Sequence, residues 1–277
     1  LYLVLPAYFA YFSLRPTRIP VTTVPAVLAG RAEEVTMQAG DGVSLSGWYI
    51  PPRNGAVIIA LHGGGDNRLG VLPHAELLMK NGYGVLMMDM RAHGNSGSEI
   101  FVEGWNAPLD IAAMVEYLHA RPEVRRIGAL GLSAGAVSII HAGAENEAIE
   151  AFVADGTGVG AASDLLDPLT PHPAVALLLV PDYWISYRFT ALFTGLAPAP
   201  PLRDQVKRIA PRPLLLIAGE VSNWEPELAA KYAASAGDAA EVWVVPNTGH
   251  IAGIHTAPEE YETRVINFLN AALVEGM

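Results

Sequence analysis

The sequence contains no cysteine, which excludes disulfide bonds, thiolate metal sites and a cysteine nucleophile. Charged residues are also scarce, at 16% of the 277 residues, and they include no run of lysines and arginines. The formal charge of −11 argues against nucleic acid as a partner, because phosphate binding needs clustered basic side chains. Hydrophobic residues make up 51% and mean hydropathy is +0.29, which indicates either an extensive core or contact with lipid.

The first residues, LYLVLPAYFAYFSL, carry no charge and are followed by Arg15 and Arg18. A membrane-spanning helix needs roughly 20 apolar residues, so this stretch is short, and the sequence has no initiator methionine. Residues 1–30 are therefore interpreted either as the end of a truncated membrane anchor with its linker, or as a helix that packs on the domain. The first interpretation implies association with a membrane and the second leaves a cytoplasmic location open; oligomeric state stays undetermined.

Residues 31–277 have the pattern of one large α/β domain. Asp41-Gly42 stands between two β-rich runs and predicts a hairpin. Short apolar runs then alternate with segments of helical periodicity, which predicts a doubly wound, mostly parallel sheet with an antiparallel edge. The apolar runs are AVIIALHG, GVLMMDMR, RIGALGLS, AFVADG, RPLLLIAG and EVWVVPNTGH.

No strand pattern occurs from about residue 157 to residue 210, a stretch rich in proline and aromatic residues. Insertions of this length between two strands are commonly functional lids. We predict a helical cap here, with an apolar substrate as the weaker implication of its aromatic side chains.

A serine between two glycines, in Gly131-Leu-Ser133-Ala-Gly135, is the candidate nucleophile. The segment follows an apolar strand and precedes a helical pattern, the context expected of a nucleophile elbow. The backbone N–H of Ala134, at a helix N-terminus, is a candidate oxyanion donor. A second donor is expected after an earlier strand, where LHGGGDNR supplies the N–H of Gly64, with Asn67 bracing the loop.

A serine nucleophile needs a base and an acid that orients the base. His250 is the candidate base, because it ends the last apolar run and follows a glycine turn. The acid is expected after RPLLLIAG, where Glu225 is favoured and Glu220 is the alternative. Glu227 is expected inside the next helix. Asp155, at the end of AFVADG, is a further, less favoured candidate for the acid.

Four motifs in this order, LHGGGDNR, MMDMRAHGNSG, GLSAG and VPNTGH, resemble those of the α/β-hydrolase superfamily. The resemblance covers Glu33 to the C-terminus and implies the α/β-hydrolase fold and a serine hydrolase activity. It also implies that Asp89 and Arg91 hold loops near the site. The loop from His62 to Arg68 is similar to that of membrane-anchored bacterial esterases and dipeptidyl-peptidase-like relatives.

The hormone-sensitive-lipase-like esterases, by contrast, have Gly-Asp-Ser-Ala-Gly around the serine, where this chain has Leu132. In that group an Asp-Pro-Leu sequence is expected after the seventh strand. This chain has one at Asp167, but it lies in the expected cap. The chain is therefore placed outside that group.

The resemblance implies hydrolysis of a carboxylic ester, a small molecule, through an acyl-enzyme and without metal or cofactor. Two alternatives stay open from the sequence. The same residues would serve a peptidase, amidase or thioesterase, and the fold also occurs in binding proteins without catalytic activity.

Overall fold

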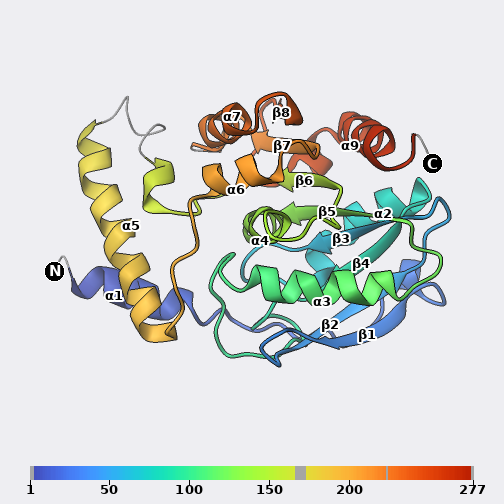
Figure 1. Ribbon diagram of the computed structural model, residues 1–277, viewed down its shortest axis with the longest axis horizontal. Coiled ribbons are helices and arrows are strands. Elements are labelled where there is room, and N and C mark those ends of the chain that lie inside the picture. The colour runs from blue at the N-terminus through green and yellow to red at the C-terminus, as the bar shows by residue number, and fades with distance from the viewer. Residues whose placement is uncertain (1–2, 166–172, 223, 276–277) are drawn as a thin grey trace.

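The computed structural model describes residues 3–165, 173–222 and 224–275, so Asp167 lies outside the described residues. Its centre is an eight-stranded sheet of order β1-β2-β4-β3-β5-β6-β7-β8 (Figure 1). β1 pairs antiparallel with β2 and β2 antiparallel with β4, whereas every later pairing is parallel. The strands are β1 (Glu33–Gln38), β2 (Ser44–Ile50), β3 (Ala56–Leu61), β4 (Gly84–Met88), β5 (Arg126–Leu132), β6 (Ala151–Asp155), β7 (Leu214–Gly219) and β8 (Ala240–Val245).

Helices cover both faces of this sheet, which confirms the predicted doubly wound α/β-hydrolase fold. One face carries α3 (Ala107–His119), α4 (Ala134–Gly143), α6 (Leu202–Ile209) and α7 (Glu225–Ala236). The other carries α2 (Leu72–Lys80), the short α8 (Gly253–Thr256) and α9 (Pro258–Leu273). The predicted hairpin is the β1–β2 pair, whose turn contains Gly42 at φ +82°.

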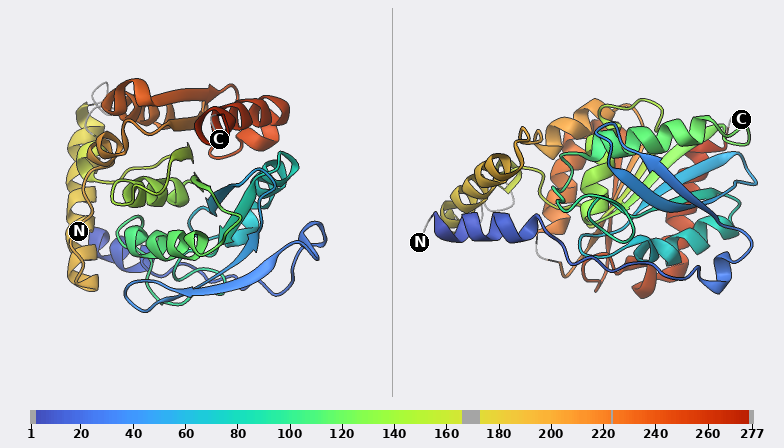
Figure 2. Two further views of the ribbon diagram at one scale, coloured as in Figure 1. Left: turned by 45° about the vertical axis from the view of Figure 1, so that its right-hand side comes forward. Right: turned by 90° about the horizontal axis from the view of Figure 1, so that it is seen from below.

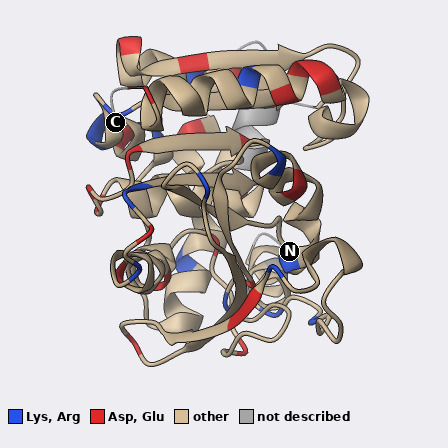
Figure 3. Cartoon of the chain, turned by 90° about the vertical axis from the view of Figure 1, so that its right-hand side faces the viewer, with Lys and Arg blue, Asp and Glu red and all other residues tan. Residues whose placement is uncertain are grey.

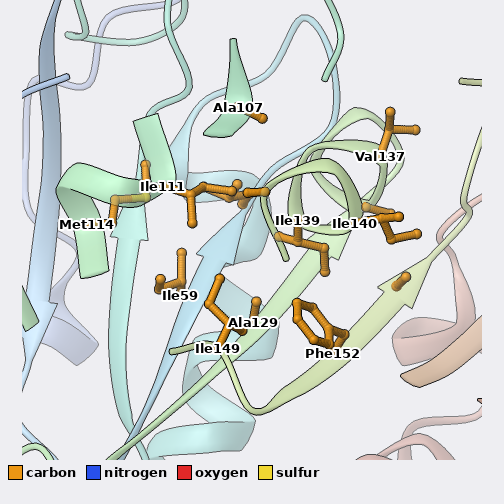
Figure 4. Packing of buried hydrophobic residues seen from close by; sticks show 14 of the residues in the cluster. Ile59, Ala107, Ile111, Met114, Ala129, Val137, Ile139, Ile140, Ile149 and Phe152 are labelled. Carbon is orange, nitrogen blue, oxygen red and sulfur yellow. The ribbon is translucent and has the colours of Figure 1, made fainter. Parts of the chain in front are cut away.

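The core lies between the sheet and these two helical layers. β3, β4, β6 and β7 are buried along their whole length, as apolar strands sandwiched between helices must be. Figure 4 shows the layer beneath α3 and α4, where side chains of the strands meet those of the helices. Its labelled members include Ile59, Ile111, Met114, Ala129, Ile139, Ile140 and Phe152.

Two helices outside these layers, α1 (Val4–Ser13) and α5 (Pro173–Thr194), lie side by side at one end of the molecule (Figures 1 and 2). α5 belongs to the stretch predicted as a cap. α6 falls at the end of the same stretch, and its Leu202, Val206 and Ile209 are buried in the main core. This packing follows from its strongly amphipathic sequence, LRDQVKRI.

The N-terminal segment packs on the domain through α1 and the chain that follows it. Ala10 and Leu14 are buried, and the Leu14 carbonyl accepts the Phe101 N–H at 2.9 Å. The Arg18 guanidinium donates to the Ser96 carbonyl at 2.6 Å. Among the residues that the structure describes, no helix combines the length and the apolar character that a bilayer crossing requires. Membrane association stays a prediction.

Charged residues are scattered along helices, strands and turns (Figure 3). In the view of Figure 3, acidic residues mark the helices at the edge of the sheet, and lysines and arginines are scattered among them.

Candidate active site

Ser133 stands at the junction of β5 and α4, the strand–turn–helix arrangement that the sequence predicts. Its backbone has φ +53° and ψ −114°, a conformation that costs free energy in a residue with a side chain. The Ser133 N–H donates to the Asp155 carbonyl at 2.8 Å, which ties the turn to the end of β6. This sharp turn projects the serine hydroxyl out of the sheet.

The two glycines around Ser133 allow backbone segments to approach closely. A Cβ atom on Gly131 would lie 2.3 Å from the Gly135 carbonyl oxygen and 2.6 Å from the Ala136 nitrogen. A Cβ atom on Gly135 would lie 2.4 Å from the Leu61 carbonyl oxygen. The glycines therefore bring α4 against β3 and β5, while the positive φ falls on the serine itself.

We expect Gly131→Ala to destabilise the protein by at least about 1–3 kcal/mol, the usual cost of overpacking a closely packed site. The clashing atoms belong to the backbone of α4, which cannot move without displacing the nucleophile. Gly249→Ala is the matched control, because nothing lies within 4 Å of its Cβ position. Urea unfolding of the two variants tests this, and equal free energies of unfolding would contradict it.

His250 follows β8 and meets Ser133, although the two residues are far apart in the chain. Its Nε2 lies 2.9 Å from the Ser133 Oγ, and its Nδ1 is hydrogen-bonded to the Glu225 carboxylate. This bond with Glu225 is the largest cause that raises the pKa of His250 above its ordinary value, and burial partly opposes the increase. The structure thus brings together the serine, histidine and favoured glutamate.

Glu225, the first residue of α7, is 8% exposed, and its second carboxylate oxygen accepts the Gly219 N–H at 3.0 Å. Burial acts to raise the pKa of Glu225, but the hydrogen bonds from His250 and Gly219 lower it below the usual value. Glu220 is exposed, and its carboxylate accepts the Asn247 N–H at 2.8 Å. Glu227 lies exposed within α7.

Asp155, the less favoured candidate for the acid, is buried at 1% exposure. Its carboxylate accepts a hydrogen bond from the Tyr261 hydroxyl at 2.8 Å. Burial raises the pKa of Asp155 to about 7, and the nearby Glu225 adds to the increase. Its carboxylate is therefore bonded to α9 rather than to His250.

The glycine loop after β3 lies over the nucleophile turn. A Cβ atom on Gly63 would lie 3.5 Å from the Ser133 Cβ, and one on Gly64 would lie 3.7 Å from the Ala134 Cβ. Asn67 braces this loop, because its Oδ1 accepts the Leu69 N–H and its Nδ2 donates to the Ile19 carbonyl. The Cβ positions of Gly64 and Ala134 are thus close together, and the role of the two N–H groups as oxyanion donors stays a prediction.

Two buried histidines hold the same loop in place. His62 Nε2 accepts the Met90 N–H at 3.1 Å, so its Nδ1 carries the proton that is donated to the Gly63 carbonyl. His93 Nε2 likewise accepts the Gly65 N–H at 3.0 Å. Both rings must be neutral to accept these bonds. Burial lowers the pKa of His62 to about 4 and also lowers that of His93.

The neutral state of His62 should persist in acid. We expect its ring to keep the Nδ1–H tautomer at pH 5, because its pKa is about 4 in the folded protein. As pH falls, the His62 imidazole is protonated in the unfolded chain before it is protonated in the folded protein. The free energy of unfolding is therefore undiminished by this group above about pH 6.5 and decreases towards pH 4. The loss reaches about 3 kcal/mol. Nitrogen-15 NMR of the ring tests this; titration near pH 6.5 would contradict it.

Asp89 and Arg91 hold the loops around the site, as the resemblance implies. The Asp89 carboxylate accepts the backbone N–H and the guanidinium of Arg68, each at 2.7 Å, and the pair is almost fully buried. The Arg91 guanidinium pairs with Asp110 and with Asp41 of the β1–β2 turn. These bonds connect the hairpin, the loop after β4 and α3.

A cleft of about 740 Å³ opens beside Ser133 and His250. Its walls come from α1, the loop after β4, the segment after β6, α5 and the start of α7. Tyr183 and Tyr187 belong to the aromatic residues of the expected cap. Sequence reasoning missed several other residues of the cleft, since no motif marks them. They include Phe12, Glu103, Trp105, Asp182 and Trp224.

The fold and the motif-bearing loops around Ser133 define this chain as a serine hydrolase of the α/β-hydrolase superfamily. Its family follows from the sequence: the chain belongs to the serine aminopeptidase S33 family, whose model matches residues 52–215.

Relatives and solved structures extend this similarity beyond the matched residues. The uncharacterized protein Rv2307c of Mycobacterium tuberculosis is 30% identical over 251 residues, covering 85% of this chain and 78% of that protein. The uncharacterized protein YfhR of Escherichia coli is 24% identical over 254 residues, covering 87% and 82%. The esterase Pf2001 of Pyrococcus furiosus is 28% identical, with a TM-score of 0.76 and coverage of 94% of this chain and 98% of the esterase.

Proposed function

We propose that this hydrolase cleaves carboxylic esters through an acyl-enzyme, with Ser133 as nucleophile, His250 as base and Glu225 as the acid behind it. One observation carries the proposal: the Ser133 Oγ lies 2.9 Å from His250 Nε2, while Glu225 is bonded to the opposite ring nitrogen. The hydroxyl of Ser133, the imidazole of His250 and the carboxylate of Glu225 are thus arranged as the activation of a serine nucleophile requires.

The proposed reaction begins when His250 Nε2 takes the Ser133 proton and the Oγ attacks the ester carbonyl. The N–H groups of Gly64 and Ala134 stabilise the oxyanion of the tetrahedral intermediate. His250 then gives its proton to the departing alcohol, leaving an acyl group on Ser133. A water molecule, deprotonated by His250, releases the acid. Glu225 keeps the second proton of His250 on Nδ1 throughout.

The preference for an ester rests on the named activity of one relative. Pf2001, which matches nearly the whole chain at 28% identity, is an esterase. The family name supports a second candidate, an aminopeptidase, because amide cleavage uses the same serine, histidine and acid. A thioesterase would also share them. The alternatives differ in the leaving group that His250 must protonate.

A fluorophosphonate probe and a substrate panel test the proposal. We expect the folded protein to be labelled on Ser133, with no labelling of Ser133→Ala. Folded protein that stays unlabelled would support the alternative of a binding protein without catalysis. p-Nitrophenyl esters of graded chain length, compared with aminoacyl anilides and thioesters, then identify the leaving group. Anilide turnover above ester turnover would replace the esterase assignment by the aminopeptidase one.

A further inference from the structure

Apart from His250, the charged residues that line the active-site cleft are all acidic. They are Glu103, Asp182 and Glu225, and neither lysine nor arginine occurs among the described residues of the lining. Glu225 is already bonded to His250. Glu103 and Asp182 therefore leave negative charge beside the position of the substrate.

Glu103 lies on the loop after β4 and faces the segment after β6 across the cleft. Its Oε1 would lie 3.6 Å from a Cβ atom on Gly158. The side chain is reached by solvent, and within residues 3–165, 173–222 and 224–275 it has no hydrogen bond or ion pair. Surrounding protein atoms raise the pKa of Glu103 to about 7, and His250 partly opposes the increase. A carboxylate without a partner among these residues is free to pair with a cationic group of a substrate.

Aromatic residues line the same cleft as this carboxylate. The Trp105 and Tyr187 ring centroids lie 5.8 Å apart at an interplanar angle of 41°, and both residues line the cleft. The Tyr187 hydroxyl donates to the Val159 carbonyl at 3.2 Å, so its polar end is occupied and its ring remains for contact with a ligand. Electron-rich ring faces attract organic cations, and indole is the strongest of them.

We propose that Glu103, Trp105 and Tyr187 form a subsite for an alkylammonium group, so that the enzyme prefers substrates carrying a cation near the scissile bond. The inference rests on the proposed function, because Ser133 defines which bond is cut. Ring faces attract the methyl groups of a quaternary ammonium through their quadrupole, and the carboxylate of Glu103 supplies the opposite charge. Asp182, on the facing helix α5, adds to the negative field of the subsite.

Two pairs of esters of equal shape test the preference. The first is butyrylcholine and its isostere with a neutral tert-butyl group in place of trimethylammonium. The second is the p-nitrophenyl ester of a trimethylammonium-terminated butanoate and its tert-butyl counterpart. Because the subsite could hold either the alcohol or the acyl part, we expect kcat/KM to favour the cation at least about tenfold in one pair. Ratios of one or less in both pairs would overturn the inference.

The variants are judged by the ratio of kcat/KM for the cationic ester to kcat/KM for its neutral counterpart, since the neutral ester reports any general loss of activity. We expect Glu103→Gln to lower it by about 5- to 10-fold and Trp105→Leu to lower it by about 3-fold. Glu99→Gln is the matched control, because Glu99 lies exposed on the same loop outside the cleft and should leave the ratio unchanged. A Glu103→Gln ratio equal to that of the wild type would also overturn the inference.

Binding separates this inference from the proposed function. Calorimetric titration of Ser133→Ala with butyltrimethylammonium should give binding that Glu103→Gln weakens. Such binding without hydrolysis of any ester would refute the proposed esterase and keep the subsite. Hydrolysis of neutral esters without cation binding or preference would refute the subsite and keep the esterase.

Discussion

The Ser133→Ala variant is expected to lose at least about 10⁴-fold in kcat for ester hydrolysis, because no acyl-enzyme can form without the hydroxyl. The residual rate would come from substrate binding and from the N–H groups of Gly64 and Ala134. Steady-state hydrolysis of p-nitrophenyl butyrate measures the loss, with the wild-type concentration fixed by fluorophosphonate titration. Substantial residual turnover would show that another group attacks the ester.

The Ser133→Gly variant separates the chemical role of Ser133 from its backbone strain. Both variants lack the nucleophile and should be equally inactive. Glycine tolerates φ +53°, whereas alanine retains the strain. After allowance for the greater freedom of glycine in the unfolded chain, Ser133→Gly should be more stable than Ser133→Ala by about 1 kcal/mol. Equal or reversed stabilities in urea unfolding would mean that the turn is not strained.

The sheet and the positions of Ser133 and His250 could be predicted from the sequence because each leaves a local signal. Strands such as AVIIAL and GVLMM are continuously apolar, as burial on both faces requires. Ser133 is marked by its two glycines between a strand and a helix. His250 is marked by its place after the last strand. Parallel strands end at the same edge of the sheet, so residues that follow them meet there.

The acid leaves a weaker signal, which favours Glu225 without excluding Glu220, and the cleft leaves none. Glu220 and Glu225 both follow β7, and the direction of the intervening turn decides which of them meets His250. That turn ends at Trp224, which has φ +70°, a conformation that is uncommon in an aromatic residue and unmarked in the sequence. Glu103 enters the cleft only because α1, α5 and the loop after β4 surround the same space. Such long-range packing depends on the complete fold.

The Glu225→Gln variant is expected to lose about 10³- to 10⁴-fold in kcat, the loss typical of removing the acid behind a catalytic histidine. Glu225 accepts hydrogen bonds at both oxygens, from His250 Nδ1 and from the Gly219 N–H. Glutamine has one oxygen, so its amide NH₂ must face one of these two donors. Either His250 turns to its other tautomer and can no longer accept the Ser133 proton, or the Gly219 N–H is left unpaired.

Glu220→Gln is the matched control for this substitution. Glu220 precedes the same helix by a short turn, but its carboxylate accepts only the exposed Asn247 N–H. We expect its kcat to stay within about twofold of the wild type, since a solvent-exposed hydrogen bond contributes little. A larger loss in Glu220→Gln than in Glu225→Gln would assign the acid to Glu220 and contradict the geometry of the site.

The pH profile tests whether Glu225 acts through His250. Activity requires neutral His250, so kcat/KM falls as pH drops through the pKa of that imidazole in the free enzyme. The hydrogen bond and charge of Glu225 raise this pKa, and Asp155 and Glu103 contribute in the same direction. Glu225→Gln removes the largest of these effects, so the acidic limb should move to lower pH while the maximum falls. Glu220→Gln should leave the limb in place. A structural defect alone would lower the maximum without moving the limb, and a limb that moved to higher pH would contradict the assignment of Glu225.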